Sequence, residues 1–261
     1  MSKQRLFKLD DGTIGLEACE RFVTGAEEDC RRTDRPDLIW MGHISLPHTL
    51  NLAAVSHHLA GNQDRARQFA TRVAPAAKDY FFGDWRTKVP TDDKKIDPRW
   101  WRDKESWSDN FRYAICWAMV LGDWDSVKAL AAYPDHGRSM EEDGIEKMPA
   151  VRELLIALAE FIRGEKVAHV ANEVAKLTGA NWRGTMHLAR ALDEIIAQDS
   201  AGVQQHLLDF FKAHHKRKKS KDITDTISID GTILYLLARH EGLNVILPPK
   251  LYVYVIDLSG A

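Results

Sequence analysis

The chain has 261 residues, a formal net charge of −2 and a pI near 6.6. Its apolar fraction of 44% and charged fraction of 28% are typical of a folded globular protein and, with this length, exclude collagen-like, disordered and mini-protein classes. The near-neutral charge argues against nucleic acid as the main partner, because general nucleic-acid binders usually carry a basic domain. Cys19, Cys30 and Cys116 are widely spaced, which indicates reduced thiols and no zinc site.

The N-terminal region carries the weakest pattern. The sequence at Leu6–Leu9 is compatible with a strand, and the first 40 residues as a whole are compatible with a strand or a short helix. The opening residues lack the apolar stretch of a signal peptide, and nowhere do roughly 18 apolar residues follow one another. We therefore expect a cytoplasmic protein with no membrane partner. We divide it into an N-terminal segment, 1–40, and one all-helical domain, 41–261.

From residue 46 to residue 241 the apolar residues follow a helical period. Residues 46–60 carry two apolar faces, which predicts a helix between two neighbours. Residues 110–121 are apolar almost all round, so we expect this helix to be the most buried one. Further stripes are Val151/Leu154/Leu155/Leu158/Ile162, Val167/Val170/Ala171/Val174/Leu177, Leu188/Leu192/Ile195/Ile196, Val203/Leu207/Phe210/Phe211/His214 and Ile229/Ile233/Leu236/Leu237. Residues 251–256 form a strand or a short terminal helix.

Short turns join consecutive helices. Gly61, Gly122 and Gly164 are each followed by a capping acid or amide or by a new helix, and residues 197–203 repeat the arrangement without the leading glycine. Their uneven spacing excludes a regular tetratricopeptide array. The sequence predicts an all-α fold of stacked antiparallel helical hairpins, an irregular repeat-like bundle of about ten helices in one domain.

Two long insertions, residues 83–103 and 134–148, interrupt the helical pattern. Loops of this length are usually functional or disordered. The first insertion contains Trp85, Trp100 and Trp101. Tryptophan is enriched at binding hot spots, so these residues are candidate anchors for a partner, although they could instead fold back over the helical core.

Motifs for catalysis are absent from the sequence. His57 and His58 lie on a helix, but a metal site needs three or four converging ligands, and no HExxH pattern is present. A hydrogen-bonded interior or boundary histidine is the favoured interpretation of His57. Cys116 lies in the most apolar helix and is expected to be an inert buried thiol. We therefore expect no catalytic residue, no metal and no cofactor.

The segment 214–221 is a basic cluster at a helix C-terminus. Cations in this position complement the helix dipole, and a solvated helix end is the simpler interpretation. The same charges could also contact phosphate or an acidic partner. The cluster is therefore the alternative binding surface to the tryptophan-rich insertion.

Three segments together resemble a known family. Residues 111–133 contain an apolar helix, a Gly-Asp turn and an amphipathic helix; residues 154–165 repeat the pattern; and residues 230–249 close the chain. Over roughly residues 40–256 the sequence resembles the immunity protein 49 family, all-helical partners of bacterial polymorphic toxins. The resemblance implies a cytoplasmic antitoxin that binds and occludes a cognate toxin, the C-terminal domain of an effector. It brings no catalytic residues with it.

The resemblance and the insertions together give a binding hypothesis. The residues that we expect to bind the toxin are Trp85, Arg86, Trp100, Trp101, Arg102, Glu141, Glu142 and Asp143. Two other functions stay open at this point. One is a helical-repeat adaptor or scaffold for protein–protein contacts, and the other is a small helical enzyme with a His-rich site around His57. Self-association is also left open.

Overall fold

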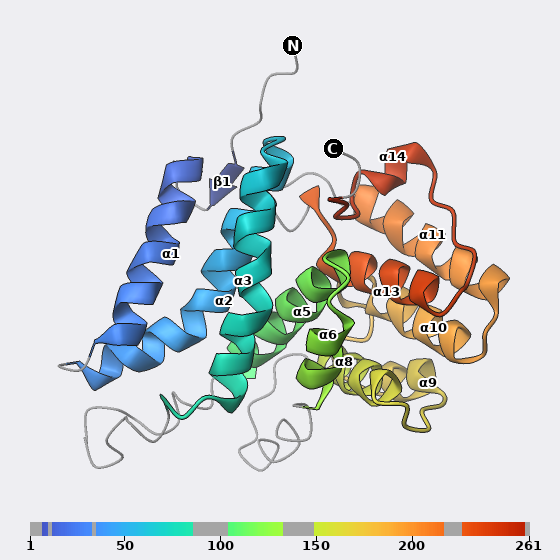
Figure 1. Ribbon diagram of the computed structural model, residues 1–261. Coiled ribbons are helices and arrows are strands. Elements are labelled where there is room, and N and C mark those ends of the chain that lie inside the picture. Colours follow the sequence, from blue (N-terminus) through green and yellow to red (C-terminus); the bar gives the residue numbers. More distant parts are fainter. Residues whose placement is uncertain are drawn as a thin grey trace. The chain divides into compact units, whose positions relative to one another are not determined.

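The computed structural model describes residues 7–9, 12–32, 35–85, 104–132, 149–216 and 226–258. Eleven α-helices, one 3-10 helix and one two-stranded antiparallel hairpin occur among these residues (Figure 1). Consecutive helices pack against one another as helical hairpins, which confirms the all-α fold predicted from the apolar stripes.

The helices gather into two compact units. One comprises Met1–Gly122 with Leu258–Ala261, and the other comprises Asp123–Asp257. The division falls in a short turn between two helices. The helical pattern of apolar residues in the sequence continues across this turn and gives no sign of a boundary there. The boundary that we expected after residue 40 lies inside a helix, because the helical pattern of residues 46–60 extends back to Pro36.

The first unit begins with β1 (Phe7–Leu9) and β2 (Gly12–Ile14), which pair antiparallel with Phe7 opposite Ile14. Its helices are α1 (Leu16–Arg31), α2 (Pro36–Leu59), α3 (Gln63–Phe82) and α5 (Lys104–Val120). α2 packs against α1, α3 and α5, as its two apolar faces predict (Figure 1). The first 40 residues thus contain a strand, as expected, but also a full helix of 16 residues.

α2 carries polar groups into the interior of this unit. Residues 50–57 are all buried, and Pro47 lies inside the helix without an N–H to donate. Asn110 of α5 donates from Nδ2 to the Ile44 carbonyl at 2.9 Å. Trp117 of α5 donates from Nε1 to Asn51 Oδ1 at 2.9 Å. Side chains of α5 therefore satisfy polar groups of α2 that helix packing has removed from water.

α5 is the centre of the first unit. Phe111, Ala114, Ile115, Cys116 and Trp117 are fully buried, so the expectation for residues 110–121 is confirmed. Close packing around such a helix leaves no space for a charge or for water.

The second unit contains the remaining helices. They are α6 (Trp124–Ala131), α8 (Pro149–Ile162), α9 (Val170–Ala175), η3 (Trp182–Gly184), α10 (Thr185–Ile196), α11 (Ser200–Lys216), α13 (Ile229–His240) and α14 (Pro249–Tyr252). α10 packs against α8, α9, α11 and α13. A Cβ at Gly231 of α13 would come within 2.6 Å of Phe211 Cζ, so only glycine permits this approach to α11.

The predicted turns have the expected geometry. Gly61, Gly122 and Gly164 all have positive φ, which suits a residue without a Cβ at the end of a helix. The turn without a leading glycine places Gln198 in the same conformation, with φ 58°. The chain therefore reverses in the same way at all four positions.

The stripe at residues 167–177 forms a shorter helix than expected. His169 adopts a left-handed conformation, and α9 begins only at Val170. Asp193 of α10 accepts hydrogen bonds from the N–H groups of Val170 and Ala171 at 2.7 and 2.9 Å. A neighbouring helix, rather than a local capping residue, therefore sets the start of α9. For residues 251–256 we expected a strand or a short helix. The structure has the end of a short helix, α14, followed by a turn.

The chain returns to the first unit at Leu258. Arg67 of α3 donates from Nη2 to the Leu258 carbonyl at 3.1 Å. Among the described residues, no helix has the length and apolar character needed to cross a bilayer.

We predict that Ala118→Asp destabilises the protein by several kcal/mol, because Ala118 is buried in α5 and the new carboxylate would have no partner. Ala129→Asp in α6 is the matched control: the change is the same, but residue 129 is exposed and the expected effect is within about 0.5 kcal/mol. Chemical denaturation measures both. Equal midpoints for the two variants would contradict the packing of α5.

Candidate functional site

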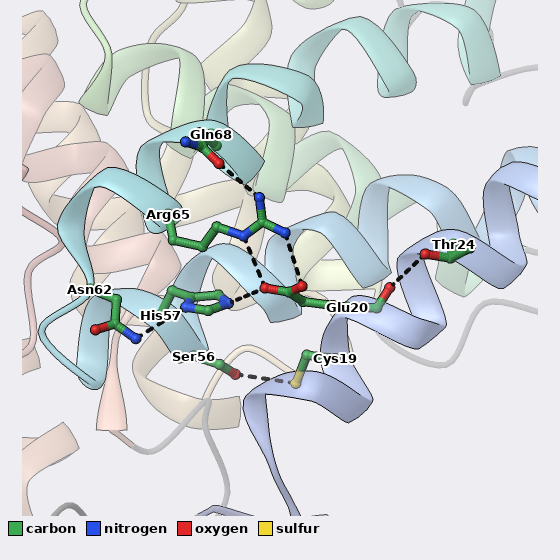
Figure 2. Close-up of polar contacts among 8 residues, drawn as sticks. All are labelled: Cys19, Glu20, Thr24, Ser56, His57, Asn62, Arg65 and Gln68. Carbon is green, nitrogen blue, oxygen red and sulfur yellow. Dashed lines mark hydrogen bonds and ion pairs between the residues drawn. The ribbon is translucent and has the colours of Figure 1, made fainter.

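Three helices of the first unit bring Glu20, His57 and Arg65 together, from α1, α2 and α3 respectively (Figure 2). His57 Nε2 lies 3.0 Å from Glu20 Oε1. Arg65 donates from Nε and Nη2 to the two carboxylate oxygens of Glu20, at 2.9 Å each. His57 is only 5% exposed, so its interpretation as a hydrogen-bonded interior histidine is confirmed.

Both ring nitrogens of His57 are occupied. Asn62 places its amide Nδ2, which can only donate, 3.4 Å from His57 Nδ1. His57 Nδ1 therefore accepts, and Nε2 carries the proton that is donated to Glu20. The ring also stacks on Phe69 with a centroid distance of 5.5 Å. A general base needs a nitrogen that faces a substrate, and here each nitrogen faces a side chain of the protein.

Glu20 is held as an anion. The hydrogen bond from Arg65 lowers the pKa of Glu20, and the hydrogen bond from His57 acts in the same direction. The Arg65 guanidinium also lies 4.6 Å from the centre of the Phe69 ring. The Glu20 carboxylate therefore joins three helices through its bonds to His57 and Arg65.

The cysteines lie in environments that suppress reactivity. Cys19 Sγ is 3.6 Å from Ser56 Oγ, and burial raises the pKa of the Cys19 thiol. Burial also raises the pKa of Cys30 to about 12, with Asp79 adding to the effect. Cys116 is fully buried in α5, as expected. Reactive thiols have lowered pKa values, whereas burial shifts the pKa of Cys19 and of Cys30 in the opposite direction.

Metal binding finds no support in the described part of the chain. Within it, no group of three or more His, Cys, Asp or Glu side chains is placed to hold a metal ion.

Trp85 is a core residue, which corrects its assignment to the partner-binding set. Its side chain is 2% exposed, and its Nε1 lies 3.2 Å from the carbonyl oxygens of both Asp79 and Tyr80. The indole stacks on His43 at 5.1 Å and on Tyr80 at 6.1 Å between ring centroids. The interpretation that the insertion folds back over the helices therefore holds at Trp85.

The other members of the predicted set lie outside the described residues. They are Arg86, Trp100, Trp101, Arg102, Glu141, Glu142 and Asp143. Their role in binding stays a prediction.

Within the basic segment 214–221, only the first three residues are described. His214 is buried against the Tyr254 ring, and His215 Nδ1 lies 2.6 Å from the Tyr254 hydroxyl. The beginning of this segment is thus attached to the C-terminal turn of the chain.

The second unit has an open groove that the sequence did not predict. Tyr235 and Arg239 of α13, Tyr252 of α14 and the connecting chain from Gly242 to Leu247 enclose about 480 Å³. We call it the α13 groove. Tyr235 and Tyr252 meet edge to face at 5.9 Å between ring centroids. Ile246, 67% exposed, is the most exposed of the large apolar residues that the structure describes.

Contacts within the unit hold the walls of the α13 groove. Arg239 Nη1 lies 3.4 Å from the Tyr235 hydroxyl, and Tyr252 donates its hydroxyl proton to Asp257 Oδ2 at 2.6 Å. Burial and the bond to Asp257 raise the pKa of Tyr252, so its hydroxyl is protonated at neutral pH. The alternation of Leu243, Val245 and Leu247 with polar or exposed neighbours is a strand-like signal in the sequence that could have indicated this wall.

We predict that Glu20 makes the stability of the protein depend on pH. Its pKa is lowered on folding, so its contribution is present above the unfolded value of about 4.3 and is lost as pH falls through the folded value. Because the carboxylate is partly exposed, the loss is about 1 kcal/mol or less. Denaturation of wild type and Glu20→Gln at about pH 6 and about pH 3 measures it. The difference in unfolding free energy between the two proteins should shrink at the lower pH.

Glu17→Gln serves as the control for this experiment, because Glu17 lies on the same helix with its side chain 95% exposed. A Glu20→Gln effect that does not change with pH would exclude a stabilising role for the Glu20 carboxylate charge.

Trp85→Ala is predicted to lower the stability of the first unit by about 3–5 kcal/mol, the usual cost of removing a buried tryptophan. Trp182→Ala is the comparison, because Trp182 is only half-buried and should cost less. Thermal unfolding followed by circular dichroism measures both changes. A Trp85→Ala protein that melts like wild type would return Trp85 to the candidates for partner binding.

Comparison of the chain with protein-family models, curated proteins and solved structures finds no match.

Proposed function

We propose that this protein is a cytoplasmic immunity protein that neutralises a cognate bacterial toxin domain by binding and occluding it, without turnover of its own. The proposal begins with the resemblance of residues 111–133, 154–165 and 230–249 to the immunity protein 49 family. It relies on protein–protein contact, for which the described structure has suitable surface.

The observation that carries the proposal is the α13 groove. It is built largely from residues 230–249, one of the three segments on which the resemblance rests. Exposed Ile246 borders it, and exposed Val253 follows Tyr252 directly in the chain. Tyrosine and arginine, which line the groove, are the residue types that most often anchor protein interfaces.

The His57 region favours this function over the enzyme alternative. The His57 ring, the Glu20 carboxylate and the Arg65 guanidinium are hydrogen-bonded to one another or to Asn62. An adaptor would also use protein–protein contact, and the uneven helix spacing argues against a regular concave array. A toxin partner distinguishes the two, since an adaptor does not protect cells.

The test uses the product of the gene directly upstream. Its C-terminal domain is expressed in a bacterial host alone and together with this protein. We expect growth arrest in the first case and growth in the second. Calorimetry on the purified pair should give a Kd on the order of nM, about −12 kcal/mol. A toxic domain that arrests growth equally with and without this protein would contradict the proposal.

The tryptophan-rich insertion gives a second prediction. Replacing both Trp100 and Trp101 by alanine should weaken toxin binding by about 2 kcal/mol or more, roughly thirtyfold, because interface tryptophans are frequent hot spots. The melting temperature should stay that of wild type. A stable double variant that binds as tightly as wild type would exclude this insertion as the binding face.

A further inference from the structure

The segment Leu243–Leu247, which forms one wall of the α13 groove, has the alternating burial that is typical of an extended β-strand. Leu243, Val245 and Leu247 are buried, whereas Asn244 and Ile246 are exposed, so burial alternates with a period of two. The five residues would span about 16 Å in this conformation. No strand pairs with the segment in the described part of the chain.

Hydrogen bonds define the two edges of this segment. Gln204 of α11 donates from Nε2 to the Ile246 carbonyl at 2.8 Å and accepts from the Ile246 N–H at 2.7 Å. A residue in a strand directs its N–H and C=O to the same edge, and its neighbours direct theirs to the opposite edge. One edge, that of Ile246, therefore faces Gln204, while Leu243, Val245 and Leu247 share the other.

The second edge faces α13 and the groove. Leu243 donates its N–H to the Ala238 carbonyl at 2.9 Å, as part of the C-terminal cap of α13, and Val245 and Leu247 line the groove. Among the described residues, nothing hydrogen-bonds to the main chain of Val245 or to the N–H of Leu247. A strand edge with unpaired N–H and C=O groups is a template for another extended chain.

One of the residues that line the groove, Arg239, is positively charged. Arg239 is exposed, and its guanidinium is steadied by the Tyr235 hydroxyl. The hydrogen bond to Tyr235 and, to a smaller extent, the charge of Asp257 raise the pKa of Arg239. The Asp257 carboxylate, however, accepts its hydrogen bond from Tyr252. Within the described chain no carboxylate forms an ion pair with Arg239, so the groove offers a cation to an acidic ligand.

We propose that the α13 groove binds an extended acidic segment of a partner polypeptide, which adds as a strand to the Val245–Leu247 edge and places a carboxylate on Arg239. Only a polypeptide backbone supplies N–H and C=O groups at the repeat that this edge requires. The assignment of this segment to the toxin rests on the function proposed above. The binding of an extended acidic chain to the groove does not depend on that function.

A defined peptide tests the chemistry without the toxin. The probe is a capped heptapeptide of alternating threonine and valine with a central glutamate, added to the ¹⁵N-labelled full chain. We expect amide shifts at Val245 and Leu247 and little change at Asn244, because the Asn244 N–H lies on the Gln204 edge. A Kd on the order of 1 mM is expected for a single short strand.

Matched peptides and variants separate the two parts of the contact. The same peptide with N-methyl groups on alternate residues should lose binding, and a central lysine should weaken it. Arg239→Gln should weaken binding of the glutamate peptide about fivefold. Arg190→Gln is the control, since Arg190 is an exposed arginine on α10 outside the groove.

Three results would overturn the proposal. One is the absence of shifts at Val245 and Leu247 at peptide concentrations well above 1 mM. Another is equal binding of the N-methylated peptide. The third concerns the free protein: if the protection of these two amides from hydrogen exchange rises with protein concentration, a second copy of the chain occupies the groove.

The toxin provides a separate measurement. If it binds, Arg239→Glu should weaken the complex and the Val245 and Leu247 amides should exchange at least tenfold more slowly in it. Tight toxin binding without these changes would uphold the proposed function and overturn this use of the groove. Peptide binding without any protective toxin pairing would do the reverse.

Discussion

Burial of polar atoms along α2 is the constraint on which the first unit depends. α2 packs against three helices, so an entire stretch of it is removed from water together with an amide, a hydroxyl and an imidazole. Each such group costs free energy unless it is hydrogen-bonded. The partners come from other helices: Trp117 for Asn51, Cys19 for Ser56 and Glu20 for His57. The polar groups thereby specify which helix faces which side of α2.

These hydrogen bonds between helices explain why residue types that suggest catalysis in the sequence contribute here to helix packing. His57 has the residue type of a catalyst, but a buried imidazole next to a paired carboxylate is equally a way to connect helices. Arg65 completes the arrangement by holding Glu20 ionised and covering Phe69. In the second unit, close contact between helices is seen at Gly231, where α13 approaches the rings of Phe210 and Phe211.

The sequence predicted most of the helices, because burial of one face imposes a 3.6-residue period that is visible locally. It predicted the burial of α5 because residues 110–121 are apolar almost all round. It missed α1, whose buried stripe of Cys19, Val23 and Ala26 is interrupted by charged residues and by exposed Phe22. The late start of α9 at Val170 was also invisible in the sequence, since Asp193, which accepts from its first N–H groups, lies more than 20 residues away.

The candidate sites were harder to predict than the fold. The link between Glu20 and His57 spans 37 residues, and no local pattern reveals it. Trp85 was predicted to be an exposed anchor because it lies in an irregular segment of the sequence. Its partners, His43 and Tyr80, lie on α2 and α3, which precede it in the sequence. The α13 groove needs α11, α13 and α14 at once. Spacing within one segment cannot indicate contacts that only the packed chain creates.

The return of the chain at Leu258 has a practical consequence for handling the protein. In sequence, the second unit is inserted into the first, since the chain leaves at Gly122 and comes back through the bond from Arg67 to the Leu258 carbonyl. Trimming the last residues, or fusing a bulky tag directly after them, therefore perturbs α3 rather than the neighbouring helices in the chain. A circularly permuted protein that begins at Asp123 and has Ala261 joined to Met1 would make each unit continuous in sequence.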